Sequence, residues 1–155
     1  TQRTLFRRRK IGFIYQFFNL IPVLSVIENI TLIAELDGRS PAEYRPRALS
    51  LLEQVGLAGR MDDFPDTLSG GEQQRVAIVR SLVNDPGIIL ADEPTGNLDA
   101  ETGLAILALL TDLVRTRGKT LIMVTHSPEA VTFAHHVFAV RNGQLEPQPE
   151  STGRP

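Results

Sequence analysis

The second half of the chain alternates short apolar runs with longer stretches in which apolar residues recur every three or four positions. The runs at 87–91 and 120–124 have strand length and few polar residues, which is typical of strands covered on both faces of a parallel sheet. Between them, residues 100–116 place their apolar side chains on one helical face, and this pattern ends at Gly118. Asn142 followed by glycine, between two apolar stretches, is a strong hairpin signal. The alternation predicts an α/β fold with a mostly parallel sheet and flanking helices.

The first half of the chain predicts one strand followed only by helices. Residues 11–15 form a short apolar run of strand length. Three amphipathic stretches follow, and each begins directly after a serine that can cap a helix N-terminus: Ser25, Ser40 and Ser69. We therefore expect a helical subdomain over about residues 17–85, inserted into the α/β core and including the helix after Ser69.

Composition limits the classes of protein to which the chain can belong. It has 155 residues, 42% of them hydrophobic and 22% charged, which predicts one globular domain. The net charge of -2 gives no general attraction to nucleic acid, and we interpret the basic run at 7–10 as a solvated surface. The absence of cysteine excludes disulfides and metal-thiolate sites. No apolar stretch reaches the roughly 20 residues of a membrane-spanning helix, so we expect membrane association to come through a partner.

The stretch LSGGEQQRVAI, at 68–78, places two glycines at the start of a helix, although each glycine inside a helix costs about 1 kcal/mol relative to alanine. Ser69 and Glu72 have the spacing of a capping box, which explains the helix start. The same spacing recurs at the two preceding helices, which contain no such glycines. A second interpretation is that Gly70 and Gly71 let a phosphate approach bare amides at the helix N-terminus. These residues alone leave both interpretations open.

Polar side chains follow each of the three apolar runs, at the point where a strand of an open α/β sheet meets its ligand. They are Gln16, Asp92 with Glu93, and His126. Side chains of adjacent strand residues diverge, so one carboxylate can hold Mg²⁺ while the other orients or deprotonates a water. Taken singly, His126 is more often a structural histidine, and Asp99 is a suitable N-cap for the helix that follows it.

The ordered motifs of the chain resemble the nucleotide-binding domain of ABC transporters. The glutamine after the first strand is followed by LSGGEQQR, then IILADEPTGNLD, then VTHS. YQFFNLIP and ADEPTGNLD look most like the branch containing lipoprotein-release, macrolide-export and cell-division ATPases. The resemblance implies a P-loop NTPase-type ABC ATPase core. It covers residues 1–145 as a partial ABC ATPase domain, and we expect 146–155 to be a disordered tail.

The resemblance also implies a role for each polar residue at the strand ends, with ATP and Mg²⁺ as cofactors. Gln16 matches the Q-loop glutamine, which senses the γ-phosphate and contributes to the Mg²⁺ site. Asp92 matches the Walker B aspartate that holds Mg²⁺. Glu93 matches the general base, and His126 matches the switch histidine that stabilises charge developing on the γ-phosphate.

The glycine pair matches the signature motif of this family. In the family, two nucleotide-binding domains face each other head to tail, and the signature of one covers the γ-phosphate of ATP held by the other. The resemblance therefore implies that the signature residues and Asp99 of the D-loop at 96–99 bind nucleotide carried by a second copy. The signature residues concerned are Ser69, Gly70, Gly71 and Gln73.

One motif of the family is missing from the chain. A P-loop requires G-x-x-x-x-G-K-[ST] after a strand, but the only candidate, RGKT at 117–120, ends a predicted helix and precedes a strand. Leu113 stands where the first glycine should be. The family places the P-loop and an adenine-stacking aromatic residue before the Q-loop. We therefore expect the chain to be the C-terminal part of a longer domain, without its N-terminal strands and inactive alone.

These observations leave three functional hypotheses. The first is an ATP-hydrolysing subunit on the cytoplasmic side of the inner membrane, which drives export or extraction through a transmembrane permease docked near residues 17–26, and which has no nucleic-acid partner. The second is a non-catalytic interaction module. The third is a chromosome- or repair-type ATPase, but only about fifty residues without sustained heptads separate Gln16 from Leu68, where those proteins carry very long coiled coils.

Overall fold

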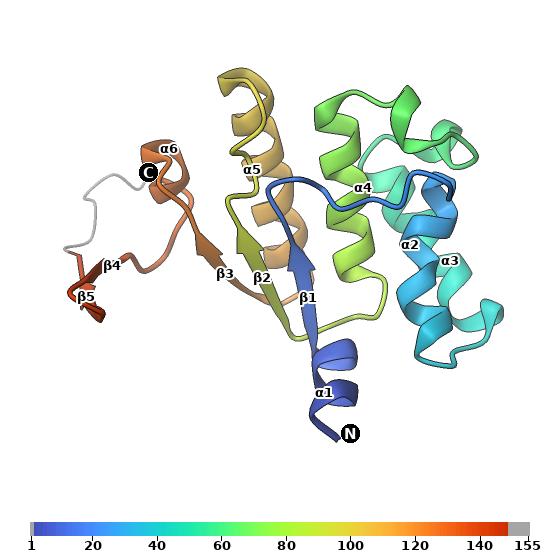
Figure 1. The fold of residues 1–155 in the computed structure, drawn as a ribbon, viewed down its shortest axis with the longest axis horizontal. Helices are drawn as coiled ribbons and strands as arrows, with labels where there is room; N and C mark the ends of the chain where they lie inside the picture. The colour runs from blue at the N-terminus through green and yellow to red at the C-terminus, as the bar shows by residue number, and fades with distance from the viewer. Residues whose placement is uncertain (1, 149–155) are drawn as a thin grey trace.

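The computed structural model describes residues 2–148, and Figure 1 shows helices gathered beside a small parallel sheet. The helices are α1 (Gln2–Lys10), α2 (Val26–Leu36), α3 (Pro41–Gln54), α4 (Gly70–Leu82), α5 (Ala100–Thr116) and α6 (Pro128–Val131), with short 3₁₀ turns at Ala58–Arg60 and Pro65–Thr67. The strands are β1 (Ile11–Ile14), β2 (Ile88–Asp92), β3 (Thr120–Val124), β4 (Phe138–Arg141) and β5 (Gln144–Pro147). The predicted α/β fold is confirmed.

The three strands β1, β2 and β3 form a parallel sheet in that order. Ile14 pairs with Ala91, and Asp92 pairs with Val124, so the carboxyl ends of all three strands lie at one edge of the sheet. Since parallel strands place their following loops on the same side, this register brings distant polar residues to one edge.

One face of the sheet packs against α4 and α5, which lie beside one another in Figure 1. Ile14, Ile89 and Ala91 are buried on this face. On the opposite face, within residues 2–148, Ile122 is 52% exposed and Val124 is 65% exposed. The prediction that the runs at β2 and β3 are covered on both faces is therefore wrong for the described chain, because burial alternates along each strand.

The segment between β1 and β2 contains α2, α3 and α4, and within it the structure has no strand. Ser25 caps α2 with the reciprocal hydrogen bonds of a capping box. Ser40 occupies the N-cap position of α3 with Pro41 as the next residue, but its side chain makes no capping hydrogen bond. The three helices pack on one another through buried aliphatic side chains, among them Ile30, Leu51, Leu52 and Ile78.

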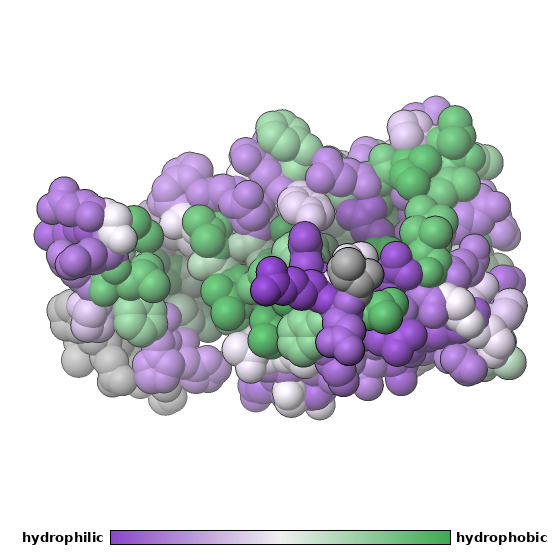
Figure 2. Space-filling model, turned by 60° about the horizontal axis from the view of Figure 1, so that its bottom comes forward, coloured by the Kyte–Doolittle hydropathy of each residue, from purple (hydrophilic) through white to green (hydrophobic). Residues whose placement is uncertain are grey.

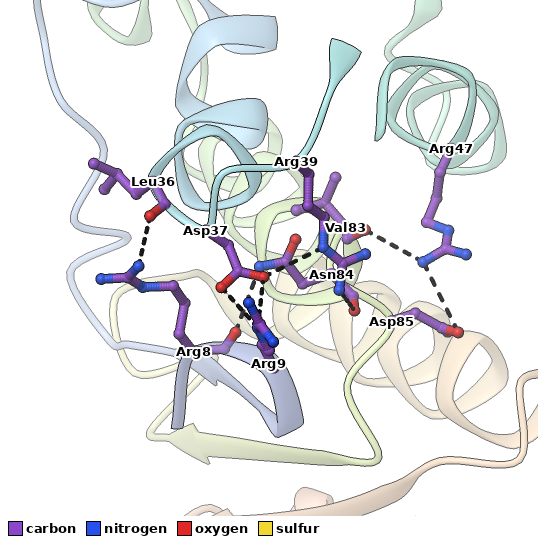
Figure 3. Close-up of polar contacts among 9 residues, drawn as sticks. All are labelled: Arg8, Arg9, Leu36, Asp37, Arg39, Arg47, Val83, Asn84 and Asp85. Carbon is purple, nitrogen blue, oxygen red and sulfur yellow. Dashed lines mark hydrogen bonds and ion pairs between the residues drawn. The ribbon is translucent and has the colours of Figure 1, made fainter. Parts of the chain in front are cut away.

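The basic run near the N-terminus lies in α1, a helix without buried residues that the sequence analysis did not predict. Two of its arginines reach the end of α2: Arg8 Nη1 donates to the Leu36 carbonyl at 2.5 Å, and Arg9 Nε lies 2.9 Å from Asp37 Oδ1 (Figure 3). Figure 2 shows hydrophilic side chains gathered around α1, with hydrophobic patches on either side of them. The run is exposed apart from the half-buried Arg8, so the interpretation as a solvated surface is wrong only for that residue.

The Asp37 carboxylate is 2% exposed and also contacts Arg39 Nε at 3.4 Å. Burial by itself would raise the pKa of Asp37, but hydrogen bonds and charges from Arg9 and Arg39 outweigh burial and lower the pKa below its usual value. On the same side of the molecule, Asp85 accepts from Lys119 at 2.9 Å and lies 3.8 Å from Arg47 (Figure 3 shows the arginine contact). These ion pairs connect the residues that follow the C-termini of α2 and α4 to neighbouring elements.

The predicted hairpin is confirmed. β4 and β5 pair in antiparallel fashion around Asn142 and Gly143, which have φ angles of 50° and 77°. The prediction that a disordered tail starts at residue 146 is wrong at its first residues. Glu146 and Pro147 belong to β5, and the Gln148 amide donates to the Val137 carbonyl at 2.9 Å. These residues are ordered because their main chain pairs with β4 across the hairpin, and polar side chains do not prevent such pairing. Residues 149–155 of the expected tail lie outside the described residues.

Candidate functional site

Glu93 follows β2 in a backbone conformation that few non-glycine residues adopt. Its φ is 46°, in the left-handed region, which costs about 1–3 kcal/mol for such a residue. The Glu93 amide donates to the Val124 carbonyl at 2.8 Å, so the sheet register holds this turn against β3. The turn directs the carboxylate toward the residues that follow β3.

Three donors from one short segment surround the Glu93 carboxylate. The Nδ1 atom of His126 lies 2.6 Å from Glu93 Oε1, and the His126 amide donates to the same oxygen at 3.0 Å. The Thr125 hydroxyl donates to Oε2 at 3.1 Å. The Glu93 side chain is 18% exposed, whereas the His126 side chain is 86% exposed. The structure thus brings these two predicted residues together and adds Thr125, which the sequence analysis missed although it directly precedes the histidine.

Gln16 lies at the same edge, against the loop that follows Glu93. Its Nε2 atom donates to Asn97 Oδ1 at 3.3 Å, and Asn97 Nδ2 donates to the Gln16 carbonyl at 3.1 Å. The side chain of Gln16 also lies on Gly96, where an added Cβ would come within 2.7 Å of Nε2. The sequence analysis predicted Gln16 but not Asn97, because no local pattern links positions 81 residues apart.

Asp92 is the last residue of β2 and is exposed. Within the described residues there is no group of three or more histidine, cysteine, aspartate or glutamate side chains that could hold a metal ion by themselves. One carboxylate and one amide oxygen at the same edge instead suit Mg²⁺, which usually keeps several waters and completes its shell with phosphate oxygens. The residues that fit such an ion here are Asp92 and Gln16.

The start of α4 has the predicted capping box. Glu72 N donates to Ser69 Oγ at 3.3 Å, and Ser69 N donates to Glu72 Oε2 at 2.8 Å. Close packing within the chain also explains why glycines occupy positions 70 and 71. A Cβ at Gly70 would lie 3.2 Å from Leu98, and a Cβ at Gly71 would lie 2.8 Å from the Thr102 methyl group. The glycine pair therefore lets α4 approach the start of α5 closely.

Two glutamines extend this contact between α4 and its surroundings. Gln73 Nε2 donates back to the Leu68 carbonyl at 3.1 Å. Gln74 is fully buried and donates to the Pro94 carbonyl at 2.5 Å, which joins α4 to the turn that carries Glu93. The sequence analysis missed Gln74 because its partner lies beyond β2.

Asp99 caps α5, as predicted. Its Oδ1 atom accepts from Thr102 N at 2.9 Å, and hydrogen bonds from Thr102 lower the pKa of Asp99. The stretch RGKT is the end of α5: Gly118 has a φ of 61°, and the Lys119 ammonium binds Asp85. The interpretation of this stretch as a helix terminus and not a P-loop is confirmed.

Several of these contacts meet on a single loop, residues 93–99, which connects β2 to α5 (Figure 1). Gln16 contacts its middle, His126 contacts its first residue, and Gly70 of α4 lies against Leu98. The structure therefore places Gln16, His126 and Gly70, which come from three separate motifs, around the same loop.

A groove of about 390 Å³ opens between α1, β1, α2 and α4, and its lining includes Arg7, Asn19, Ile33 and Arg80. The Arg80 guanidinium donates to the carbonyls of Phe18 and Asn19, both at 2.6 Å, and burial lowers the pKa of Arg80. The two acceptors have φ angles of 60° and 50°. Arg80 thus holds the loop after Gln16 in a fixed left-handed turn.

Comparison with known proteins places this geometry in a family. The sequence model of the ABC transporter family matches residues 1–96. An uncharacterized ABC transporter ATP-binding protein of Mycobacterium tuberculosis is 57% identical over 145 residues, covering 94% of this chain and 58% of the relative. The lipoprotein-releasing system ATP-binding protein LolD of Shewanella is 44% identical over 140 residues, covering 90% of this chain and 61% of the relative.

The fold is also shared with a solved ABC structure. The dimeric post-hydrolysis ATP-binding cassette MJ0796, bound to ADP and Pi, superposes with a TM-score of 0.81 at 42% identity, covering 99% of this chain and 68% of that one. The chain spans 58% of the length of the M. tuberculosis relative. Because the family model matches more than half of the chain, the protein belongs to the ABC transporter family.

Proposed function

We propose that the chain is the part of an ABC transporter ATPase that carries the signature motif, the Mg²⁺ aspartate and the catalytic base. The observation that carries this proposal is the Glu93 carboxylate, held at the end of β2 by His126 and Thr125. Family membership and the nucleotide-bound relative support it.

Glu93 acts as the general base for the attacking water. Its carboxylate accepts the proton of that water as the oxygen attacks the γ-phosphorus of ATP, and the bond to the ADP leaving oxygen breaks. Three hydrogen bonds already fix the orientation of the carboxylate, so little reorganisation is needed when the water arrives. His126, mostly exposed, turns its ring toward the γ-phosphate and stabilises the charge that develops there.

The γ-phosphate of a nucleotide carried by a second copy is bound by the N-terminus of α4. Ser69 is exposed and the two glycines are partly exposed, so the helix start is open to solvent, and the dipole of the 13-residue helix favours an anion there. Gln73 and Asp99 flank this site. The solved cassette is dimeric, which supports pairing of two copies, and dimerisation of this chain is part of the proposal.

Mg²⁺, when bound with the nucleotide, neutralises charge on the phosphate oxygens. Asp92 and Gln16 would hold it, since a carboxylate and an amide oxygen are ligands that Mg²⁺ prefers. Gln16 also reports the presence of the γ-phosphate through the same amide.

The groove beside Arg80 takes a short helix of a transmembrane permease. None of the described helices is long and apolar enough to cross a bilayer, which supports a peripheral position reached through that partner. The transported molecule is exported or extracted by the permease, and the likeness to a lipoprotein-releasing ATPase supports extraction from the membrane. We place the protein on the cytoplasmic side of the inner membrane.

The test compares the chain alone with a fused protein, in which the chain follows an added N-terminal segment that carries a strand and the motif G-x-x-x-x-G-K-[ST]. We expect no ATP hydrolysis by the chain alone and measurable hydrolysis by the fused protein. Glu93→Gln in the fused protein should lower kcat by about 10²–10⁴-fold and leave nucleotide binding intact. Glu101→Gln, in the first turn of α5, is the matched control and should keep the parent rate. A folded fused protein without activity, or one whose Glu93→Gln variant hydrolyses at the parent rate, would overturn the proposal.

A further inference from the structure

Asn97 contacts Gln16 through both ends of its side-chain amide. Asn97 Oδ1 accepts from Gln16 Nε2 at 3.3 Å, and Asn97 Nδ2 donates to the Gln16 backbone carbonyl at 3.1 Å. We propose that Asn97 is a positioning residue, which fixes the orientation of the Gln16 amide so that its oxygen is presented for Mg²⁺. This inference rests on the proposed function and gives a role to a residue of the 96–99 stretch to which the sequence motifs assigned none.

The orientation follows from the chemistry of the two amides. A side-chain amide has one oxygen, which can bind a cation, and one NH₂ group, which cannot. Gln16 uses its NH₂ group toward Asn97, which leaves Oε1 as the atom presented elsewhere. If the Gln16 amide turned over, two acceptor oxygens would face each other and the hydrogen bond would be lost.

Asn97 cannot turn over either without losing contacts. Its own NH₂ group is committed to the Gln16 carbonyl, so its oxygen must be the atom that faces Gln16 Nε2. The two hydrogen bonds therefore select one orientation for both amides. An asparagine in an exposed turn usually bonds to its own neighbouring backbone, whereas Asn97 reaches a residue 81 positions away.

Gly96 restricts the remaining freedom of the Gln16 side chain. An added Cβ at Gly96 would lie 2.7 Å from Gln16 Nε2 and 3.0 Å from its Cδ, so the amide lies directly on the glycine. The Gly96 amide donates to the Glu93 carbonyl at 3.0 Å, which closes the turn between the base and Asn97. A change at Asn97 is thus expected to move Gln16 while the turn that carries Glu93 stays closed.

The first experiment measures the contact itself and needs no nucleotide. In the ¹⁵N NMR spectrum of the 155-residue chain, the side-chain NH₂ signal of Gln16 is assigned by its loss in Gln16→Glu. Asn97→Leu, which keeps the size and removes both hydrogen bonds, should shift this signal and speed its hydrogen exchange. Asn97→Asp keeps the acceptor for Gln16 Nε2 but loses the donor to the Gln16 carbonyl, so it should return the exchange rate only part of the way to the parent value, and Glu101→Gln should change nothing. A Gln16 signal that is unchanged in Asn97→Leu would overturn the inference.

The second experiment measures the consequence for Mg²⁺ in the fused protein. Asn97→Leu should raise the Mg²⁺ concentration needed for half-maximal hydrolysis by about tenfold, since residues that orient a metal ligand typically act on this scale. The KM for ATP at saturating Mg²⁺ and the Tm should stay at the parent values, and Asn97→Asp should recover most of the Mg²⁺ affinity. A lowered Tm with unchanged Mg²⁺ dependence would show a structural role only and would reject the inference. If the fused protein hydrolyses nothing, the proposed function fails, and the NMR measurement alone decides the role of Asn97.

Discussion

His126 Nδ1 lies 2.6 Å from Glu93 Oε1, and this contact joins the residue after β3 to the residue after β2. The same carboxylate also accepts from the Thr125 hydroxyl and the His126 amide, so it does not depend on the imidazole for its position. The ring is mostly exposed and can leave the carboxylate without disrupting packing.

We expect His126→Ala in the fused protein to lower kcat for ATP hydrolysis by about 10²–10³-fold, the effect typical of removing one group that stabilises transition-state charge. The Tm should stay within about 2 °C of the parent, because the exposed ring contributes little packing. Steady-state kinetics and a thermal melt measure both values. A large fall in Tm with little change in kcat would mean that the histidine is structural.

Gly12 should not tolerate alanine, because an added Cβ would lie 2.3 Å from the Ser81 carbonyl oxygen of α4. Helix and strand would have to separate, at a cost of about 1–3 kcal/mol in the free energy of unfolding. Urea denaturation of the chain measures this cost. Gly59→Ala is the matched control, since nothing lies within 4 Å of its added Cβ, and it should change stability by less than about 0.5 kcal/mol.

Asp37 should contribute a pH-dependent part of the stability. Its pKa in the folded chain is lowered from the ordinary value of 3.8, so its contribution is fully present above 3.8 and is lost as pH falls through the folded value. The free energy of unfolding, measured by urea from about pH 5 to about pH 2, should therefore fall more steeply for the parent than for Asp37→Asn. Parallel curves for the two proteins would show that the ion pairs with Arg9 and Arg39 contribute nothing.

Gly71 allows the packing and phosphate interpretations of the glycine pair to be separated. In the parent, Gly71→Ala meets the Thr102 methyl group at 2.8 Å, which offsets the gain of about 1 kcal/mol expected from placing alanine in a helix. In a Thr102→Ser background the methyl group is gone, so Gly71→Ala should stabilise the chain in urea denaturation. If the bare amide binds phosphate, hydrolysis by the fused protein should fall in both backgrounds. Recovery of hydrolysis by Thr102→Ser would mean that the glycine serves packing alone.

Elements with local signals at both ends could be predicted from the sequence. The bounds of α5 match the prediction because Asp99 caps its start and Gly118 ends it. The strand β3 was also predicted with the observed bounds. The helix α1 was missed because it buries no side chain and therefore shows no apolar face.

The candidate site was predicted only as far as its motifs extend. Gln16, Glu93 and His126 each follow an apolar run, which is a local signal. Gln74 and Asn97 act through partners 20 and 81 residues away, and such pairs depend on the register of the sheet and on helix packing. Burial on both sheet faces was predicted from apolar composition, which does not report what packs on each side.

The loop from 93 to 99 has a consequence for how sequences of this kind can diverge. Positions of this seven-residue loop contact three separate segments, which are the segment after β1, helix α4 and the residues after β3, so all three segments constrain substitutions in the loop. Acceptable replacements should therefore occur as coordinated sets, in which positions 16, 70 and 126 change together with their partners in the loop. Aligned relatives should show pairwise covariation converging on this stretch.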